Sequence, residues 1–240
     1  MLGIKTALKN FDDQVTLKRV KKICEREFRE QTAGKINERP IEFQFVFKQL
    51  TNFYPKTVLD VGTGLTALPH LMRNCGFMVT AIDNVRDYWP KGMINRHYHV
   101  IDDDVTNLKL KSKFDFITCI SVLEHVIDHG AAVRNMISHL NPGGHLVLSF
   151  PYTHSKYVKN VYDLPSSEAK GKKMAFTTQS YSEKEVLSWI SDGSAEIADQ
   201  EFWQFFTGES WTCGERVVPP KKVSKNDLHQ MSCLLIRKKP

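Results

Sequence analysis

The sequence lacks the features that would assign it to a membrane or to an oxidising compartment. No apolar run approaches the ~18–20 residues that span a bilayer. Residues 1–10 lack the apolar core and the cleavage site of a signal peptide. The five cysteines are odd in number, widely scattered and form no C-x-x-C pair, which favours reduced thiols over a disulfide framework or a zinc site. We therefore expect a cytoplasmic protein that does not insert into a membrane.

Acidic residues are fewer than basic ones, 27 against 33, and the net charge is +6. Much of the basic excess lies in residues 18–22, in residues 219–225 and in the closing RKKP. Such residues either attract an anionic partner, such as a phosphate, a nucleic acid or an acidic sugar, or keep exposed surfaces soluble. Because no stacking aromatic residues are interleaved with them, a nucleic-acid partner is not favoured.

The hydrophobic pattern divides the chain into two parts. Residues 1–56 have helical spacing of apolar residues and are predicted to form an N-terminal helical cap. Residues 57–240 alternate short apolar runs with amphipathic helices and are predicted to form one α/β domain. The predicted strands are residues 57–61, 78–83, 97–101, 114–120, 145–150, 196–202 and 232–237. Strands alternating with helices predict a Rossmann-like, doubly wound and mostly parallel seven-stranded sheet.

One segment interrupts the alternation of strands and helices. Residues 151–181 carry turn residues, lysines and aromatics, and they follow the end of the predicted fifth strand. A loop of this length inside a compact domain is usually functional or disordered. Since ligands of doubly wound sheets bind at the carboxyl ends of the strands, we predict that this segment is a lid over the site. The next helix is predicted to begin at Ser182, which forms a capping box with Glu185.

A glycine-rich turn follows the first predicted strand. Gly62, Gly64 and Ala67 fit the G-x-G-x-x-A pattern that binds a dinucleotide, and Asp83 lies at the end of the second strand, where it can bind ribose hydroxyls. S-adenosylmethionine is bound by similar loops. These features alone therefore leave both cofactors open.

The distribution of charge separates the two cofactors. Asp60, Asp83 and Asp104 stand at the ends of three successive predicted strands. A pair of like charges ~4 Å apart costs about 4 kcal/mol at an effective dielectric constant near 20. A pyrophosphate would add to this repulsion, whereas a cationic sulfonium cofactor would relieve it. The acidic rim therefore favours S-adenosylmethionine.

The motifs that carry these residues resemble those of class I S-adenosylmethionine-dependent methyltransferases. In chain order they are VLDVGTG, VTAIDN, DDDVTNL, FDFITCISVLEHV and LNPGGHLVLSFP, and they cover roughly residues 57–150. One departure is Thr66, which stands where the family has a third glycine. We expect its hydroxyl to cap the following helix.

The resemblance implies a role for each matching residue. Gly62 and Gly64 would line the methionine part of the cofactor, and Asp60 would organise its ammonium group. Asp83 would bind the ribose hydroxyls, with Asn84 beside the adenine. The remaining residues implied by the resemblance are Asp104 for the adenine amino group, the Val105 backbone for the adenine ring, and Ser121 with Val122 for the active-site floor.

Methyl transfer to an alcohol requires removal of a proton, and histidine suits this task because its unperturbed pKa is near 6.5. His125 lies at the end of the fourth predicted strand, and its alternative role is structural. His154 lies in the predicted lid, where it could simply pack. His97 and His99 would share a strand face, but at the end away from Asp104, so we expect no metal site.

The acceptor is less constrained by the sequence. The fourth motif lacks the Asn/Asp-Pro-Pro-Tyr/Phe tetrad of enzymes that methylate nucleic-acid bases, and the resemblance favours a small-molecule acceptor. We expect O-methylation of a sugar, a glycan precursor or a secondary metabolite, with the lid lysines favouring a phosphate- or nucleotide-bearing one. The alternatives are an RNA- or protein-directed methyltransferase and a dinucleotide-binding protein. The aromatic segment 202–211 either covers the sheet edge or forms an acceptor-pocket wall or a homodimer surface.

Overall fold

The computed structural model describes residues 2–29, 37–89 and 98–240. Contacts divide the chain into two units, residues 1–40 and residues 41–240. The first unit contains α1 (Leu2–Arg29), and α2 (Arg39–Phe53) belongs almost entirely to the second. Both helices lie within residues 1–56, which are predicted to form one N-terminal helical cap. The role of these helices as a cap stays a prediction.

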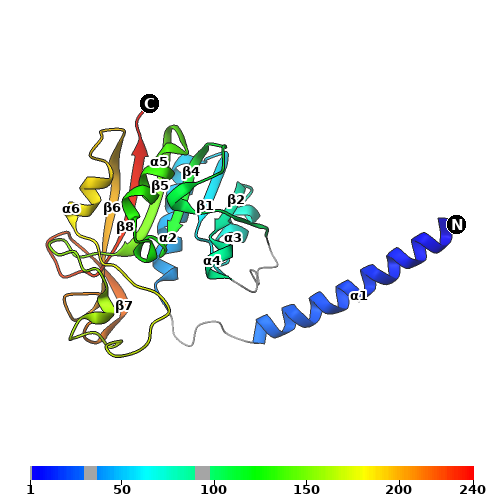
Figure 1. The fold of residues 1–240 in the computed structure, drawn as a ribbon, viewed down its shortest axis with the longest axis horizontal. Helices are drawn as coiled ribbons and strands as arrows, with labels where there is room; N and C mark the ends of the chain where they lie inside the picture. Colours follow the sequence, from blue (N-terminus) through cyan, green and yellow to red (C-terminus); the bar gives the residue numbers. More distant parts are fainter. Residues whose placement is uncertain (1, 30–36, 90–97) are drawn as a thin grey trace. The chain divides into compact units, whose positions relative to one another are not determined.

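The second unit is built on one eight-stranded sheet. Its strands are β1 (Thr57–Val61), β2 (Met78–Asp83), β3 (Val100–Asp102), β4 (Phe114–Ile120), β5 (Leu140–Pro151), β6 (Ala195–Phe206), β7 (Arg216–Val223) and β8 (Met231–Lys238). Their order across the sheet is β3-β2-β1-β4-β5-β8-β6-β7 (Figure 1). The first five strands pair in parallel, whereas β8 is antiparallel to both β5 and β6, and β7 is antiparallel to β6. The predicted Rossmann-like, mostly parallel sheet is therefore confirmed, with eight strands instead of seven.

β3, β5, β6 and β8 differ from their predicted bounds and β7 was not predicted; for β3, β5 and β7 the differences are as follows. β5 begins at Leu140, so the NPGG turn predicted after the preceding helix is part of the strand. β3 covers only Val100–Asp102, and His97, the first residue of the predicted strand, lies outside the described residues. β7 was not predicted because its sequence, RVVPPKKV, has two prolines. Proline is tolerated in β7 because this strand lies at the sheet edge, where one side needs no partner.

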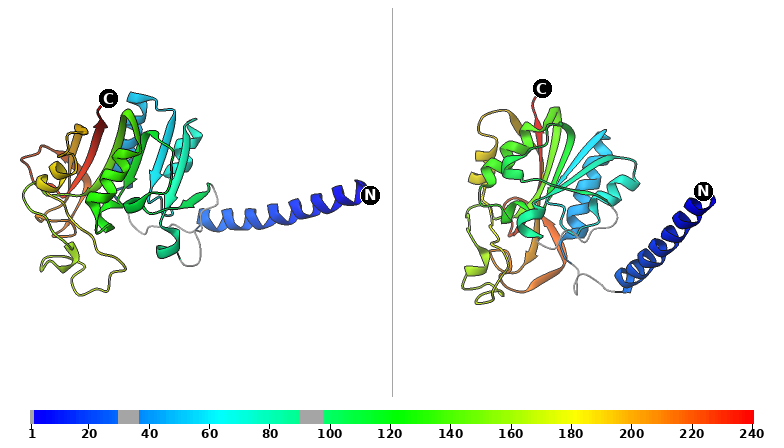
Figure 2. Two further views of the ribbon diagram at one scale, coloured as in Figure 1. Left: turned by 45° about the horizontal axis from the view of Figure 1, so that its top comes forward. Right: turned by 45° about the vertical axis from the view of Figure 1, so that its right-hand side comes forward.

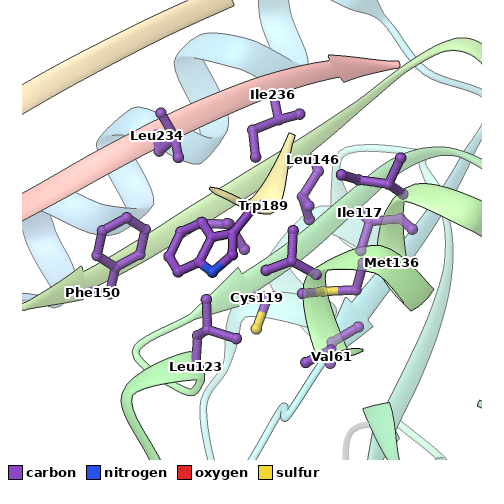
Figure 3. Packing of buried hydrophobic residues seen from close by; sticks show 14 of the residues in the cluster. Val61, Ile117, Cys119, Leu123, Met136, Leu146, Phe150, Trp189, Leu234 and Ile236 are labelled. Carbon is purple, nitrogen blue, oxygen red and sulfur yellow. The ribbon is translucent and has the colours of Figure 1, made fainter. Parts of the chain in front are cut away.

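Helices cover both faces of the sheet (Figures 1 and 2). On one face lie α5 (His129–Ser138) and α6 (Glu183–Trp189), and on the other lie α2 and α3 (Leu68–Asn74). Figure 3 shows Trp189 packed among apolar side chains of the first face, including Phe150 and Leu234. Burial of each such side chain contributes roughly 1.5–3 kcal/mol. The two hydrophobic clusters, one on each face of the sheet, hold the strand ends in fixed positions.

Helix α2 is fastened to the sheet by a buried stripe and by ion pairs. Its buried residues are spaced i, i+3, i+4, i+7 and i+8, as expected for one helical face, and they are Glu42, Phe45, Val46, Gln49 and Leu50. Lys48 donates to Asp199 and Glu201 on β6, both at 2.9 Å. The first turn of α2 lies at the carboxyl ends of the parallel strands, since Glu42 bonds to Ser121 immediately after β4.

The segment predicted as a lid, residues 151–181, has little regular structure but is well anchored. It contains the short 3₁₀ helix η3 (Val161–Asp163) and isolated bridges such as Tyr152 to Tyr181. The Tyr181 hydroxyl donates to the Leu123 carbonyl oxygen (2.7 Å) in η2 (Leu123–His125), the 3₁₀ helix after β4. After the segment, Ser182 and Glu185 form the predicted capping box at the start of α6.

The aromatic segment 202–211 belongs to the core. Phe202, Trp203, Phe205 and Phe206 are all buried. The Trp211 ring packs on the rings of Phe205 and Phe206, with centroids 5.4 and 5.2 Å apart. Burial of these rings favours the first of the two interpretations, in which the segment covers the sheet edge.

Candidate active site

The turn between β1 and α3 requires glycine at two positions. Gly62 has a φ of +68° and Gly64 a φ of +53°, which is the left-handed region that glycine enters without a steric cost. A Cβ on Gly62 would also lie 2.4 Å from a methyl group of Val122. Backbone N–H groups of Gly62 and Thr63 donate to the Ile82 carbonyl oxygen, which holds the turn against β2.

A hollow lies at this turn, at the carboxyl end of β1. It is lined by Phe43, Asp60, Val61, Gly62, Thr63, Thr66, Leu68 and Ile120. Asp60 is only 2% exposed and accepts a hydrogen bond of 2.6 Å from the Thr118 hydroxyl on β4. The predicted cofactor residues Asp60 and Gly62 thus share one hollow, and Phe43 from α2 adds a wall that the sequence analysis did not predict.

Asp83 holds the glycine turn from the end of β2. Its Oδ2 accepts the Gly64 backbone N–H at 2.8 Å, and its Oδ1 accepts the Trp89 indole N–H at 3.2 Å. The structure therefore brings Asp83, which is predicted to bind the ribose, into direct contact with Gly64. The predicted roles of both residues in binding the cofactor stay predictions.

The residues predicted to contact adenine have local partners. Asn84 caps α4 (Val85–Tyr88) by accepting the Asp87 N–H, and Asp104 caps the 3₁₀ helix η1 (Val105–Asn107) by accepting the Thr106 N–H and hydroxyl. Val105 is buried, and its carbonyl oxygen accepts from Asn135. These contacts fix the side chains beside the ends of β2 and β3, and the adenine roles stay predictions.

The prediction for Thr66 was wrong. The residue at the N-cap of α3 is Ala67, and no side chain caps that helix. The Thr66 hydroxyl instead donates back to the Thr63 carbonyl oxygen at 3.0 Å, because the turn places that oxygen within reach. Tyr98 also bonds to the Thr66 carbonyl oxygen and so supports the turn from the segment before β3.

The predicted floor residue Ser121 has an unpredicted partner. Its backbone is left-handed, with φ of +49°, and its hydroxyl donates to Glu42 of α2. Glu42 is 1% exposed and accepts a second hydrogen bond, of 2.6 Å, from the Ser149 hydroxyl on β5. The available signal was a carboxylate in the buried stripe of an amphipathic helix.

His125 lies in η2 at the end of β4, as predicted. Its Nδ1 is 2.8 Å from the Thr177 carbonyl oxygen, which can only accept, so Nδ1 carries the hydrogen. In the neutral ring Nε2 therefore bears the lone pair, and it lies 4.0 Å from the buried Glu124 carboxylate. This tautomer is suited to accept a proton at Nε2.

His154 has a different environment, outside the core and near the start of α6. Its Nε2 is 3.5 Å from the Glu183 carboxylate, and its Nδ1 is 3.4 Å from the Tyr152 hydroxyl. Burial raises the pKa of Tyr152 to about 12, so this phenol stays protonated near neutral pH. The catalytic roles of His125 and His154 both stay predictions.

Within residues 2–29, 37–89 and 98–240, no group of three or more His, Cys, Asp or Glu side chains could hold a metal ion. His99 is described, whereas its predicted companion His97 is not. Burial raises the pKa of the Cys119 thiol well above its usual value, which makes it a poor nucleophile. No helix in the described part of the chain is long and apolar enough to cross a membrane.

A glycine turn held by a strand-end carboxylate, in a mostly parallel sheet with an antiparallel strand beside β5, defines the class I methyltransferase fold. A family model described as "Methyltransferase domain" matches residues 28–211, more than half of the chain, and the chain belongs to this family. The protein is an S-adenosylmethionine-dependent methyltransferase, and the predicted alternative of a dinucleotide-binding protein is not supported.

Curated relatives are similar over about two thirds of the chain. The ubiquinone biosynthesis O-methyltransferase of Coxiella burnetii is 25% identical over 171 residues, which cover 67% of this chain and 71% of that protein. The protein of the same name from Haemophilus ducreyi is 27% identical over 184 residues, covering 69% and 76%.

Solved structures show the same fold at low identity. Magnesium protoporphyrin IX methyltransferase from Synechocystis PCC 6803 with bound S-adenosylhomocysteine has a TM-score of 0.54 and 15% identity, covering 87% of this chain and 90% of that one. TehB from Haemophilus influenzae has a TM-score of 0.53 and 17% identity, covering 88% and 65%.

Proposed function

We propose that the protein O-methylates a small acceptor that is largely apolar and carries a ring hydroxyl. Two relatives that match two thirds of the chain are named as O-methyltransferases of ubiquinone biosynthesis. Their names support oxygen as the methylated atom and favour a ring hydroxyl over the sugar hydroxyl expected from the sequence.

An apolar rim beside η2 is the observation that carries the proposal. Ile127 is 88% exposed, and Phe176 and Met174 of the lid are 49% and 40% exposed. The Phe176 ring contacts the His125 ring, with centroids 4.6 Å apart. Large apolar side chains exposed together next to a site are typical of ligand-binding surfaces. This rim supports an acceptor with an apolar body, whose reactive oxygen lies near His125.

The chemistry is an in-line displacement, for which S-adenosylmethionine supplies a methyl group activated by a sulfonium. His125 takes the proton of the acceptor hydroxyl at Nε2 as the oxygen attacks. The Thr177 carbonyl oxygen accepts the Nδ1–H of His125, and the nearby Glu124 carboxylate stabilises the imidazolium that forms. The lid segment fastened to η2 excludes water from the reacting atoms.

The acceptor class is tested with a series of compounds. Methyl transfer from labelled S-adenosylmethionine is measured to catechol, to alkylcatechols of increasing chain length and to unmodified sugars. We expect kcat/KM to rise with chain length and sugars to be inactive. A preference for sugars, or for RNA or protein added to the same assay, would refute the proposed acceptor.

The role of His125 is tested by substitution with asparagine. We expect kcat to fall about 100- to 10,000-fold, the usual range for loss of a general base, and affinity for S-adenosylhomocysteine to change less than about twofold. His154→Asn is the matched control and should leave kcat within about threefold. Equal losses in the two variants would contradict the assignment of His125 as the base.

The lid lysines give a second test, of whether the acceptor carries phosphate. The exposed side chains are Lys156, Lys159, Lys170, Lys172 and Lys173. If they attract an anionic group, replacing them with glutamine should raise KM for a phosphorylated acceptor about tenfold at low salt and leave KM for a neutral one unchanged. An unchanged KM for both acceptors would contradict the prediction that the acceptor carries phosphate.

The predicted homodimer also stays a prediction.

A further inference from the structure

A buried carboxylate bonds to Ser121, the residue predicted to form the floor of the active site. Glu42 is 1% exposed, and its Oε1 accepts hydrogen bonds from the hydroxyls of Ser121, at 2.5 Å, and Ser149, at 2.6 Å. Hydroxyl donors bond more strongly to an ionised oxygen than to a neutral one. The two serine hydroxyls therefore hold one oxygen of the Glu42 side chain in a fixed position.

The position of Glu42 relates this charge to the cofactor site. The residue after it, Phe43, and the residue before Ser121, Ile120, both line the hollow at the glycine turn. Glu42 and Ser121, which bond to each other, are therefore each next in the chain to a residue that lines the hollow. A charge buried behind such a wall is screened less than one in water.

The cofactor changes its charge during the reaction. The sulfur of S-adenosylmethionine is a positively charged sulfonium. When the S–CH₃ bond breaks, its electron pair stays on sulfur and leaves the uncharged thioether of S-adenosylhomocysteine. A fixed anion near the sulfur therefore favours the substrate form of the cofactor over the product form.

We propose that Glu42 is the residue by which this site favours the sulfonium cofactor over its uncharged product. The carboxylate acts through the wall formed by Phe43 and Ile120 and is held in place by Ser121 and Ser149. It is a positioning and charge-selecting residue, and it weakens product inhibition. The inference rests on the cofactor and on no assumption about the acceptor.

The test compares two ligands that differ at the position of the sulfur, where only one of them carries a positive charge. Sinefungin carries an ammonium-bearing carbon where S-adenosylhomocysteine has its uncharged sulfur. Dissociation constants for both are measured by calorimetry with the full chain. In Glu42→Gln the side-chain oxygen still accepts from both serines, but the charge is gone. We expect the preference for sinefungin over S-adenosylhomocysteine to fall about tenfold, and the thermal midpoint to change little.

Two control variants separate charge from packing. Glu201→Gln removes another buried carboxylate that binds α2, but Lys48, its α2 partner, lies about 9 Å further along the helix. Ser149→Ala removes one of the two hydrogen bonds that hold the Glu42 carboxylate in place. Glu201→Gln should keep the wild-type ratio of the two affinities, whereas Ser149→Ala should lower the ratio by less than Glu42→Gln does. A reduction in Glu201→Gln equal to that in Glu42→Gln would overturn the proposal.

The outcomes distinguish this inference from the proposed acceptor, because neither ligand needs an acceptor to bind. An unchanged ratio in a folded Glu42→Gln variant overturns the role of Glu42 and leaves the O-methyltransferase proposal intact. Should that variant not fold, Glu42→Asp keeps the charge but withdraws it by about 1.5 Å. Its ratio should then fall about twofold to threefold, and an unchanged ratio again overturns the role.

Discussion

Replacing Asp83 with alanine is expected to abolish binding of S-adenosylhomocysteine, with a dissociation constant at least about 100-fold higher. The Asp83 carboxylate orders the glycine turn through the Gly64 N–H and is fixed in turn by the Trp89 indole. We also expect it to bind both ribose hydroxyls. Each hydrogen bond to a charged group contributes about 1.5–3 kcal/mol, so losing two of them accounts for the expected effect. Calorimetry measures it directly.

Asp102 offers a matched control for Asp83. It is the register partner of Asp83 on the adjacent strand β3, and its carboxylate bonds to Arg86 at the surface. Asp102→Ala should leave the affinity within about twofold. Micromolar affinity retained by Asp83→Ala would count against the site described here, and equal losses in both variants would point to a general disruption of this sheet edge.

Gly62→Ala is expected to have the largest effect on stability of any single change in the turn. The new Cβ would lie 2.4 Å from Val122 Cγ1, and alanine at a φ of +68° adds strain. Left-handed backbone costs roughly 1–2 kcal/mol for a residue with a Cβ, and overpacking adds typically 1–3 kcal/mol. Together these costs lower the thermal midpoint of the ligand-free protein by about 4–20 °C, at about 2–4 °C per kcal/mol.

Two further variants separate the two causes of that loss. Gly64→Ala has the same kind of backbone strain, with φ of +53°, but its Cβ would meet only the Gly62 carbonyl oxygen at 4.0 Å. Its thermal midpoint should fall by only about 2–8 °C. The double variant Gly62→Ala, Val122→Ala should recover part of the loss. If the two glycine variants are equally unstable, contact with Val122 is not the cause.

Much of the sheet was predictable because its strands are short, buried and bounded by turn residues. β1, β2 and β4 have the predicted bounds, since each is an apolar run between clear helix or turn signals. β7 was not predictable from local sequence. Its prolines are unfavourable in a strand, and only its tertiary position at the edge beside β6 makes them acceptable.

In the site, too, residues that belong to a local motif could be predicted, whereas contacts between distant parts of the chain could not. Gly62, Gly64 and Asp83 follow from a motif and from one strand end, and the structure places Gly64 and Asp83 in contact. Glu42 lies 79 positions before its partner Ser121, and no local pattern joins them. Only the folded sheet brings α2 to the end of β4. The glycine turn could therefore be predicted from the sequence, whereas the contact of Glu42 with Ser121 could not.

The place of β8 in the sheet bears on how the protein emerges from the ribosome. β8 is the last strand in the chain, yet it lies between β5 and β6 and is antiparallel to both. Until it has been synthesised, β6 and β7 have no strand that links them to the earlier part of the sheet. β1 to β5 can pair first on the nascent chain, but β6 and β7 can join the sheet only after translation has reached residue 238. Phe202, Trp203 and Phe205 are buried in the folded protein, so during that interval we expect them to be accessible to chaperones and to other nascent chains.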